Sequence, residues 1–184
     1  MNEPTVTKMK QMKLCGMYHA FKTAIESGKT DHYTLDEFIS MLIDAEWDER
    51  HNRRIERSIK NARFHYKSNI ENINFDESRN LDRNLVLRLA RGKWGEKNEN
   101  VLSTGSTGVG KSYLGTAFGY QACIEGFKVS YFNTNKLFAK LKMAKADGSY
   151  LRELAKIQRQ EVIILDDFGL QALDSQNRIT LLEL

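Results

Sequence analysis

GSTGVGKS, from Gly105 to Ser112, matches G-x-x-x-x-G-K-[ST], the pattern of a loop that binds the phosphates of a nucleoside triphosphate. The glycines let the backbone turn sharply and present several N–H groups to phosphate oxygens. In this pattern the lysine reaches the terminal phosphates and the serine hydroxyl ligates magnesium. The motif therefore predicts a site for ATP and Mg2+. The residues expected to bind the nucleotide are Gly105, Ser106, Thr107, Gly108, Val109, Gly110, Lys111, Ser112 and Tyr113.

The residues on both sides of this loop support the interpretation. Asn100 to Thr104 is predicted to form a short strand that leads into the loop. Tyr113 to Glu125 has apolar residues at helical spacing, and Gly126 follows where a helix would end. Because the motif requires a strand, a glycine loop and a helix in this order, an ordinary glycine-rich turn is the less favoured reading.

A second segment supplies the acids that such a site needs. Val162 to Leu165 is an apolar run typical of a strand buried on both faces, and Asp166 and Asp167 follow it. We expect Asp166 to hold magnesium together with Ser112. Asp167 occupies the position where many such ATPases carry a Glu that polarises the attacking water, so Lys111 and Asp167 are the predicted catalytic residues. Two solvated acids at a strand end are the alternative.

One more strand, Lys128 to Phe132, lies between the loop and these acids along the chain. This order is typical of the additional-strand ATPases, which include the AAA+ group. Helices are expected at 82–91, 136–146 and 150–158, a last helix is expected after a cap at Asp174 or Ser175, and Gly92 to Gly95 is expected to form a loop. The predicted fold class is α/β, with the parallel-sheet core of a P-loop NTPase of the AAA+ type.

The N-terminal third is expected to be a small all-helical domain. Thr34 to Glu37 forms a capping box that begins a helix with an apolar stripe. Glu46 and Arg50 begin a series of i,i+4 ion pairs, which indicates that this helix continues through the charged stretch, although a break near residues 50–52 is left open. The predicted domains are 1–68 (helical, binding a partner or DNA), 69–81 (linker) and 82–184 (ATPase core).

Composition restricts the setting of the protein. The chain is 41% hydrophobic and 28% charged, which is ordinary for a globular protein, and no apolar stretch is long enough to span a bilayer. The N-terminus has no apolar core of a secretory signal, and Cys15 and Cys123 are too isolated to form a disulfide framework or a metal site. We therefore expect a cytoplasmic protein without a membrane partner.

Several further stretches of the sequence belong together with the phosphate-binding loop. These stretches are Glu46 to Arg50 with Arg53 and Arg54, Ala62 to Phe64, Asn74 to Asp76, Glu99 to Leu102, Gln121 to Cys123 and Ile163 to Leu170. In this combination the sequence resembles the IstB family of transposition helper ATPases, and more distantly the DnaC-like helicase loaders. The resemblance implies an AAA+ ATPase that assembles on target DNA as an ATP-dependent homo-oligomer, remodels the DNA and delivers it to a partner transposase of the integrase type.

The chain departs from that family in two respects. The run Arg91 to Gly95 and the polar pair Ser103-Thr104 are unlike the usual approach to the first strand. The family's remaining strands, sensor residues and arginine finger are expected beyond residue 184, so the sequence resembles a C-terminally truncated copy. Loss of the arginine finger would reduce turnover by about a thousandfold or more, so we expect nucleotide binding to survive better than hydrolysis.

Two groups of basic residues are candidates for DNA contact. The first group recurs at three and four residues on one side of a helix, where it could follow phosphates or pair with the acidic block that precedes it. The second follows the strand at 128–132, a region that related initiator-type ATPases use on DNA. The first group is Arg50, Arg53, Arg54, Arg57 and Lys60, and the second is Lys136, Lys140 and Lys145.

Three functions thus stay open for the chain. The favoured one is an ATP-binding, DNA-binding helper for transposition that hydrolyses ATP when complete. A DnaC-like helicase loader in DNA replication shares the same core. A non-hydrolysing remnant that binds nucleotide and DNA would follow from a missing C-terminal part.

Overall fold

The structure is a computed structural model that describes residues 3–28, 30, 33–76, 79–97 and 99–184. Its contacts divide the chain into two compact units, Met1–Glu56 and Arg57–Leu184. The boundary between the units falls inside the long helix α3 (Leu35–Ala62). The domain limits expected from the sequence, at 68 and 81, lie further along the chain and stay a prediction.

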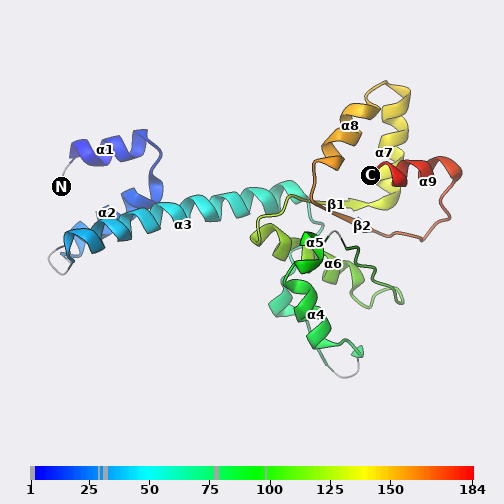
Figure 1. The fold of residues 1–184 in the computed structure, drawn as a ribbon, viewed down its shortest axis with the longest axis horizontal. Helices are drawn as coiled ribbons and strands as arrows, with labels where there is room; N and C mark the ends of the chain where they lie inside the picture. Colours follow the sequence, from blue (N-terminus) through cyan, green and yellow to red (C-terminus); the bar gives the residue numbers. More distant parts are fainter. Residues whose placement is uncertain (1–2, 29, 31–32, 77–78, 98) are drawn as a thin grey trace. The chain divides into compact units, whose positions relative to one another are not determined.

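The first unit is helical, as expected, and holds α1 (Glu3–Gln11), α2 (Cys15–Glu26) and the first part of α3 (Figure 1). The capping box is confirmed, because the Thr34 N–H donates to Glu37 at 2.8 Å and the Glu37 N–H donates to the Thr34 hydroxyl at 3.3 Å. The helix α3 continues through residues 50–52 without the break that the sequence left open.

The buried carboxylate of Glu46 connects α2 to α3 in this unit. It accepts the backbone N–H of Met17 at 3.2 Å in the first turn of α2, and the Nε–H of Arg50 at 2.6 Å. Burial raises the pKa of Glu46, but these hydrogen bonds outweigh burial and hold the pKa below its ordinary value. Glu46 therefore satisfies helix N–H groups that the residue before α2, Leu14, cannot cap with its side chain.

The second unit is built on a parallel pair of strands, β1 (Val129–Asn133) and β2 (Val162–Asp166). In their register Val129 lies opposite Val162 and Asn133 lies opposite Asp166. Side chains alternate between the two faces of a sheet, so each face receives every second residue. The parallel pairing of the two strands confirms the expected sheet type.

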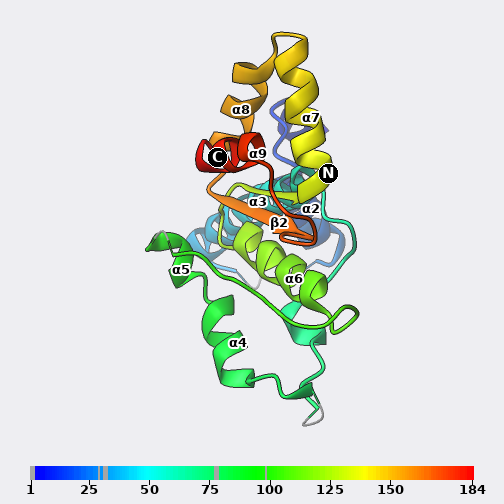
Figure 2. The same ribbon diagram turned by 90° about the vertical axis from the view of Figure 1, so that its right-hand side faces the viewer.

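The helix α6 (Lys111–Ile124), which begins within the phosphate-binding motif, covers one face of this sheet (Figure 2). Ala122 and Cys123 of α6 form a buried cluster with Val129 and Val162, and Ile164 packs against it. At Gly119 a Cβ would lie 2.4 Å from Ile164 Cδ1 and 2.7 Å from Phe64 Cε1. A side chain at this position would therefore force Ile164 or Phe64 to move.

Three helices lie on the opposite side of the sheet: α7 (Thr134–Ala146), α8 (Tyr150–Gln158) and α9 (Ser175–Leu182) (Figure 2). Leu137, Leu141 and Ile157 form their buried cluster, against which Ile163 and Leu165 pack. The alternation along β2 therefore sends Ile164 to α6 and its two neighbours to the other helical layer.

An ion-pair cluster joins α7 to α8. The buried carboxylate of Glu153 in α8 contacts Lys140 Nζ of α7 at 2.5 Å and Lys156 Nζ of its own helix at 2.5 Å. The hydrogen bonds from Lys140 and Lys156 lower the pKa of Glu153 to about 2, from an ordinary value of 4.5.

The segment before the phosphate-binding loop packs on α6 as well. It contains a short 3-10 helix (Ile70–Asn72), α4 (Arg83–Ala90) and α5 (Lys93–Glu96). Ile73 and Val86 are buried against Ala117 and Phe118 of α6. The stretch that we expected to be a linker therefore contributes apolar side chains to the core.

Two local expectations were wrong. Gly92 to Gly95 is not simply a loop, because α5 forms there around Trp94, whose indole N–H donates to the Leu89 carbonyl at 2.7 Å. Residues 99–106 have no regular structure, although a strand was expected at 100–104. A strand needs a neighbour for its backbone groups, and within the described residues the sheet consists of β1 and β2 alone.

Two further features bear on function. None of the helices in the described part of the chain combines the length and the apolar character needed to cross a membrane.

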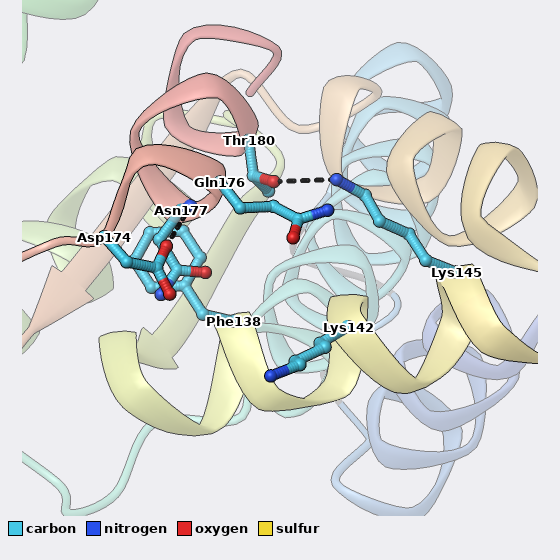
Figure 3. A pocket seen from close by; sticks show the side chains of 7 residues that line it. All are labelled: Phe138, Lys142, Lys145, Asp174, Gln176, Asn177 and Thr180. Carbon is cyan, nitrogen blue, oxygen red and sulfur yellow. Dashed lines mark hydrogen bonds between the residues drawn. The ribbon is translucent and has the colours of Figure 1, made fainter.

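A small pocket between α7 and α9, lined by Phe138, Lys145 and Thr180 among others, has a volume of about 20 Å³ (Figure 3). That volume holds about one water molecule, so the pocket is no ligand site.

The close contact at Gly119 predicts that Gly119→Ala is destabilising. The added methyl group must displace Phe64 or Ile164, which we expect to lower the free energy of unfolding by about 1–3 kcal/mol. Gly115→Ala in the same helix is the matched control, because its Cβ would lie 3.7 Å from Ile164 Cγ2, an ordinary contact. Urea denaturation of both variants measures the difference, and equal stability would contradict the packing described.

The low pKa of Glu153 predicts a pH-dependent contribution to stability. Because the pKa is depressed in the folded state, the contribution is complete above pH 4.5 and is lost as the pH falls through about 2. Glu153→Gln should therefore be less stable than wild type at pH 6, and the difference should shrink below pH 4.5. Denaturation midpoints across this range measure it, and a constant difference would argue against the ionised cluster.

Candidate functional site

The phosphate-binding motif forms an open turn that leads directly into α6. Gly105, Gly108 and Gly110 all have positive φ, of 151°, 84° and 97°. Gly110 lies immediately before the first residue of α6 in the left-handed conformation, which a residue with a Cβ adopts only at a cost. The N–H groups of the first turn of a helix have no partner within the helix and favour anions, so this geometry suits a phosphate chain.

The side chain of Lys111 folds across the loop. Its ammonium group donates to the Gly105 carbonyl at 2.8 Å and to the Ser106 carbonyl at 2.7 Å. A fixed positive charge is thereby held at the loop that is expected to receive the terminal phosphates. The catalytic role of Lys111 stays a prediction.

The side chains of Ser112 and Asp166, which are 54 residues apart in the sequence, contact each other. The Ser112 hydroxyl, in the first turn of α6, donates to Asp166 Oδ1 at the carboxyl end of β2 at 2.7 Å. A hydroxyl and a carboxylate are the hard oxygen donors that Mg2+ prefers, so these residues fit the metal that the sequence implied. The structure brings the two predicted metal ligands together, and their role in binding magnesium stays a prediction.

The other oxygen of Asp166 accepts a hydrogen bond from the hydroxyl of Tyr131 in β1. The Thr134 hydroxyl donates to the main-chain carbonyl of Asp166 at 2.7 Å. Burial raises the pKa of Asp166, but the hydrogen bonds from Tyr131 and Ser112 outweigh burial and lower the pKa below its ordinary value. The carboxylate is therefore ionised at neutral pH, as a metal ligand must be.

Asp167, the predicted catalytic acid, follows in a left-handed conformation with φ of 56°. Its Oδ2 accepts the Asn133 side-chain N–H at 2.6 Å, while Asn133 Oδ1 accepts the backbone N–H of Lys136 and caps α7. The turn directs the Asp167 side chain to the end of β1. The geometry is compatible with a general base held in one orientation.

Three residues that contact this site were not predicted from the sequence: Tyr131, Asn133 and Arg79. Tyr131 and Asn133 come from β1. The sequence predicted a strand at 128–132, which gave Tyr131 no role and did not include Asn133. Polar residues at the carboxyl end of a parallel strand are a signal for a site, and this signal could have identified Asn133. Arg79 carries no local signal, because its contact with the loop spans 30 residues.

Arg79 holds the phosphate-binding loop from outside. Its guanidinium donates through Nη2 to the Val109 carbonyl at 2.8 Å and through Nη1 to the Asn74 carbonyl at 2.9 Å. The Asn74 side chain in turn forms a tight turn with Asp76. The segment before α4 is therefore tied to the loop just before Gly110, where the chain turns into α6.

The first basic group is partly engaged by acids of its own helix. Arg50 contacts Glu46 at 2.6 Å, and Arg53 contacts Glu49 at 2.7 Å. These pairs support the alternative in which the basic residues pair with the acidic block. The DNA-binding role of the group, which also contains the exposed Arg54, Arg57 and Lys60, stays a prediction.

The second basic group is engaged as well. Lys140 contacts Glu153, while Lys145 donates to the Thr180 hydroxyl at 3.2 Å and lies 4.4 Å from the centre of the Tyr150 ring. Lys136 is exposed in the first turn of α7. Lys140 and Lys145 thus hold α7 against its neighbouring helices, and their role on DNA stays a prediction.

Comparison with known proteins finds a matching family and several similar proteins. The family model described as "IstB-like ATP binding protein" matches residues 7–184. The chain is 34% identical over 181 residues to the insertion sequence ATP-binding protein y4pL of Sinorhizobium fredii (strain NBRC 101917 / NGR234), covering 98% of this chain and 74% of that protein. It is 36% identical over 184 residues to the ATP-binding protein of insertion sequence IS1162 of Pseudomonas fluorescens, covering 100% and 80%.

The contact of Arg79 with the loop predicts an effect on nucleotide affinity. Arg79→Ala removes a charge-assisted hydrogen bond that holds Val109, and we expect ATP to bind about two- to tenfold more weakly. Arg88→Ala, which changes an exposed arginine of α4, is the control. A fluorescent ATP analogue measures both, and equal affinity of the two variants would show that the loop keeps its shape without Arg79.

Proposed function

Because the chain belongs to the family of IstB-like ATP-binding proteins, we propose that it is an ATP-dependent helper of transposition. In this proposal it assembles on target DNA as an oligomer and stimulates a partner transposase. The bound nucleotide carries magnesium, and the AAA+ core at 82–184 is preceded by the helical region at 1–68, which contacts a partner or DNA.

The hydrogen bond between Ser112 and Asp166 is the observation that carries the proposal. It places two oxygen ligands beside the loop that holds Lys111, at the start of a helix whose N–H groups favour phosphate. A loop with this motif but without a nearby ionised acid would bind phosphate and lack a magnesium site. The arrangement supports a triphosphate with its metal over a simple anion.

Each residue then has a distinct task. The loop N–H groups and Lys111 bind the phosphates, Ser112 and Asp166 hold Mg2+, and Asp167 accepts a proton from the attacking water. Magnesium, when bound, neutralises the charge that develops on the phosphates during transfer. The side chain of Asn133 keeps the Asp167 carboxylate in place.

The relatives favour transposition over helicase loading. Three relatives that carry names of insertion sequence ATP-binding proteins align with 98–100% of this chain. A transposase encoded by the same mobile element is therefore the proposed partner. The first basic group is proposed to contact DNA phosphates; its members are Arg50, Arg53, Arg54, Arg57 and Lys60.

Replacement of Lys111 tests the nucleotide site. Lys111→Ala removes the ammonium group from the loop, and we expect ATP to bind about tenfold to a hundredfold more weakly. Lys142→Ala, at an exposed position of α7, is the matched control and should bind ATP like wild type. Unchanged affinity in Lys111→Ala would refute the assignment of the loop.

Phosphate release with added DNA tests the activity. A helper of transposition should release phosphate from ATP faster when DNA is present, and should raise strand transfer by the transposase encoded beside it. Nucleotide binding without release above background would instead identify a non-hydrolysing binding protein. Stimulation of helicase loading, with no effect on strand transfer, would reject the transposition partner.

A further inference from the structure

The two oxygens of Asp166 are held by two different elements. Oδ1 accepts the Ser112 hydroxyl from α6, and Oδ2 accepts the Tyr131 hydroxyl from β1. A carboxylate with a donor on one oxygen can still rotate, whereas a donor on each oxygen fixes its plane. Tyr131 therefore contributes to the orientation in which Asp166 faces Ser112.

The strand register brings Tyr131 to this position. Tyr131 lies opposite Ile164, and Ile164 comes two residues before Asp166 in β2. The side chains of Tyr131 and Asp166 therefore emerge on the same face of the sheet, which α6 covers. A diagonal neighbour on an adjacent strand is within reach of a long aromatic side chain. The contact thus follows from the parallel pairing and requires no local distortion.

The ring of Tyr131 is itself held firmly. Tyr131 is buried, with 9% of its surface exposed, and its ring lies edge-on to Phe64 with 6.4 Å between the ring centres. Phe64 also touches α6 at Gly119, so it is fixed from both sides. A donor on a rigid ring loses little conformational freedom when it forms its hydrogen bond, which makes it an effective orienting group.

We propose that Tyr131 is a positioning residue for the magnesium site: its hydroxyl fixes the Asp166 carboxylate so that Oδ1 faces the Ser112 hydroxyl. The inference rests on the proposed magnesium role of Ser112 and Asp166. In this proposal Tyr131 acts through its hydrogen bond to Asp166. Partners of this kind behind a metal ligand typically change metal affinity by about ten- to a hundredfold when they are removed.

The test replaces the hydroxyl and keeps the ring. Tyr131→Phe should bind the fluorescent ATP analogue in EDTA as wild type does, but should need about tenfold or more Mg2+ for half of the magnesium-dependent gain in binding. Binding in EDTA and the melting temperature report on folding. Tyr150→Phe is the matched control, because Tyr150 also donates to a carboxylate, that of Glu183, away from the site.

Asp166→Asn separates the proposed magnesium role of Asp166 from the proposed role of Tyr131. If Asp166→Asn leaves the magnesium dependence unchanged, the magnesium role of Asp166 itself is wrong. If Asp166→Asn shifts it and Tyr131→Phe behaves like Tyr150→Phe, only the role of Tyr131 is wrong. The proposal requires that Tyr131→Phe has no further effect in the Asp166→Asn background, and additive effects of the two changes would overturn it.

Discussion

The hydrogen bond between the Ser112 hydroxyl and Asp166 joins the two halves of the site, and the rest of the second unit serves to hold its two ends in place. One end is the first turn of α6, which the glycine turn before it positions. The other is the last residue of β2, which pairs in register with β1. A shift of β2 by one residue would send the Asp166 side chain to the opposite face of the sheet, away from the serine.

The packing of α6 on the sheet secures this alignment. The side chains of Ile164 and Phe64 occupy the space beside Gly119 that a larger residue in α6 would fill. The same Phe64 ring lies against Tyr131, so the segment that follows α3 contacts the helix and the strand that carry the site. Tyr131 is thus buried beside Asp166, and Phe64 packs against the core.

The sequence predicted the parts of the fold whose signals are local. The capping box at Thr34 and the strand at 162–165 each carry their pattern within a few residues, and both are present. The strand expected at 100–104 fails for a non-local reason, because extended structure depends on a partner that a sequence window cannot show. The helix α5, where a loop was expected, also depends on non-local contacts. Its Trp94 packs against the buried cluster under α6, and its indole N–H donates to the Leu89 carbonyl.

The site shows the same division between local and non-local information. The motif predicted Lys111 and Ser112, and the apolar run predicted Asp166, because these residue types follow fixed patterns. The supporting contacts of Tyr131 and Arg79 cross between elements that are 30 or more residues apart. Such contacts depend on strand register and on the course of the chain, and no local pattern encodes them.

The engagement of Glu46 affects how the basic stretch of α3 is to be interpreted. Arg50 belongs to that stretch, yet its Nε–H neutralises a buried carboxylate that also caps α2. Loss of the guanidinium would leave a charge uncompensated inside the N-terminal helical unit, so a defect in nucleic-acid affinity could originate in the folding of that unit. Arg54 is exposed and lies one turn beyond Arg50. Replacement of Arg54 therefore measures electrostatic attraction to a polyanion without disturbing the contact between Arg50 and Glu46.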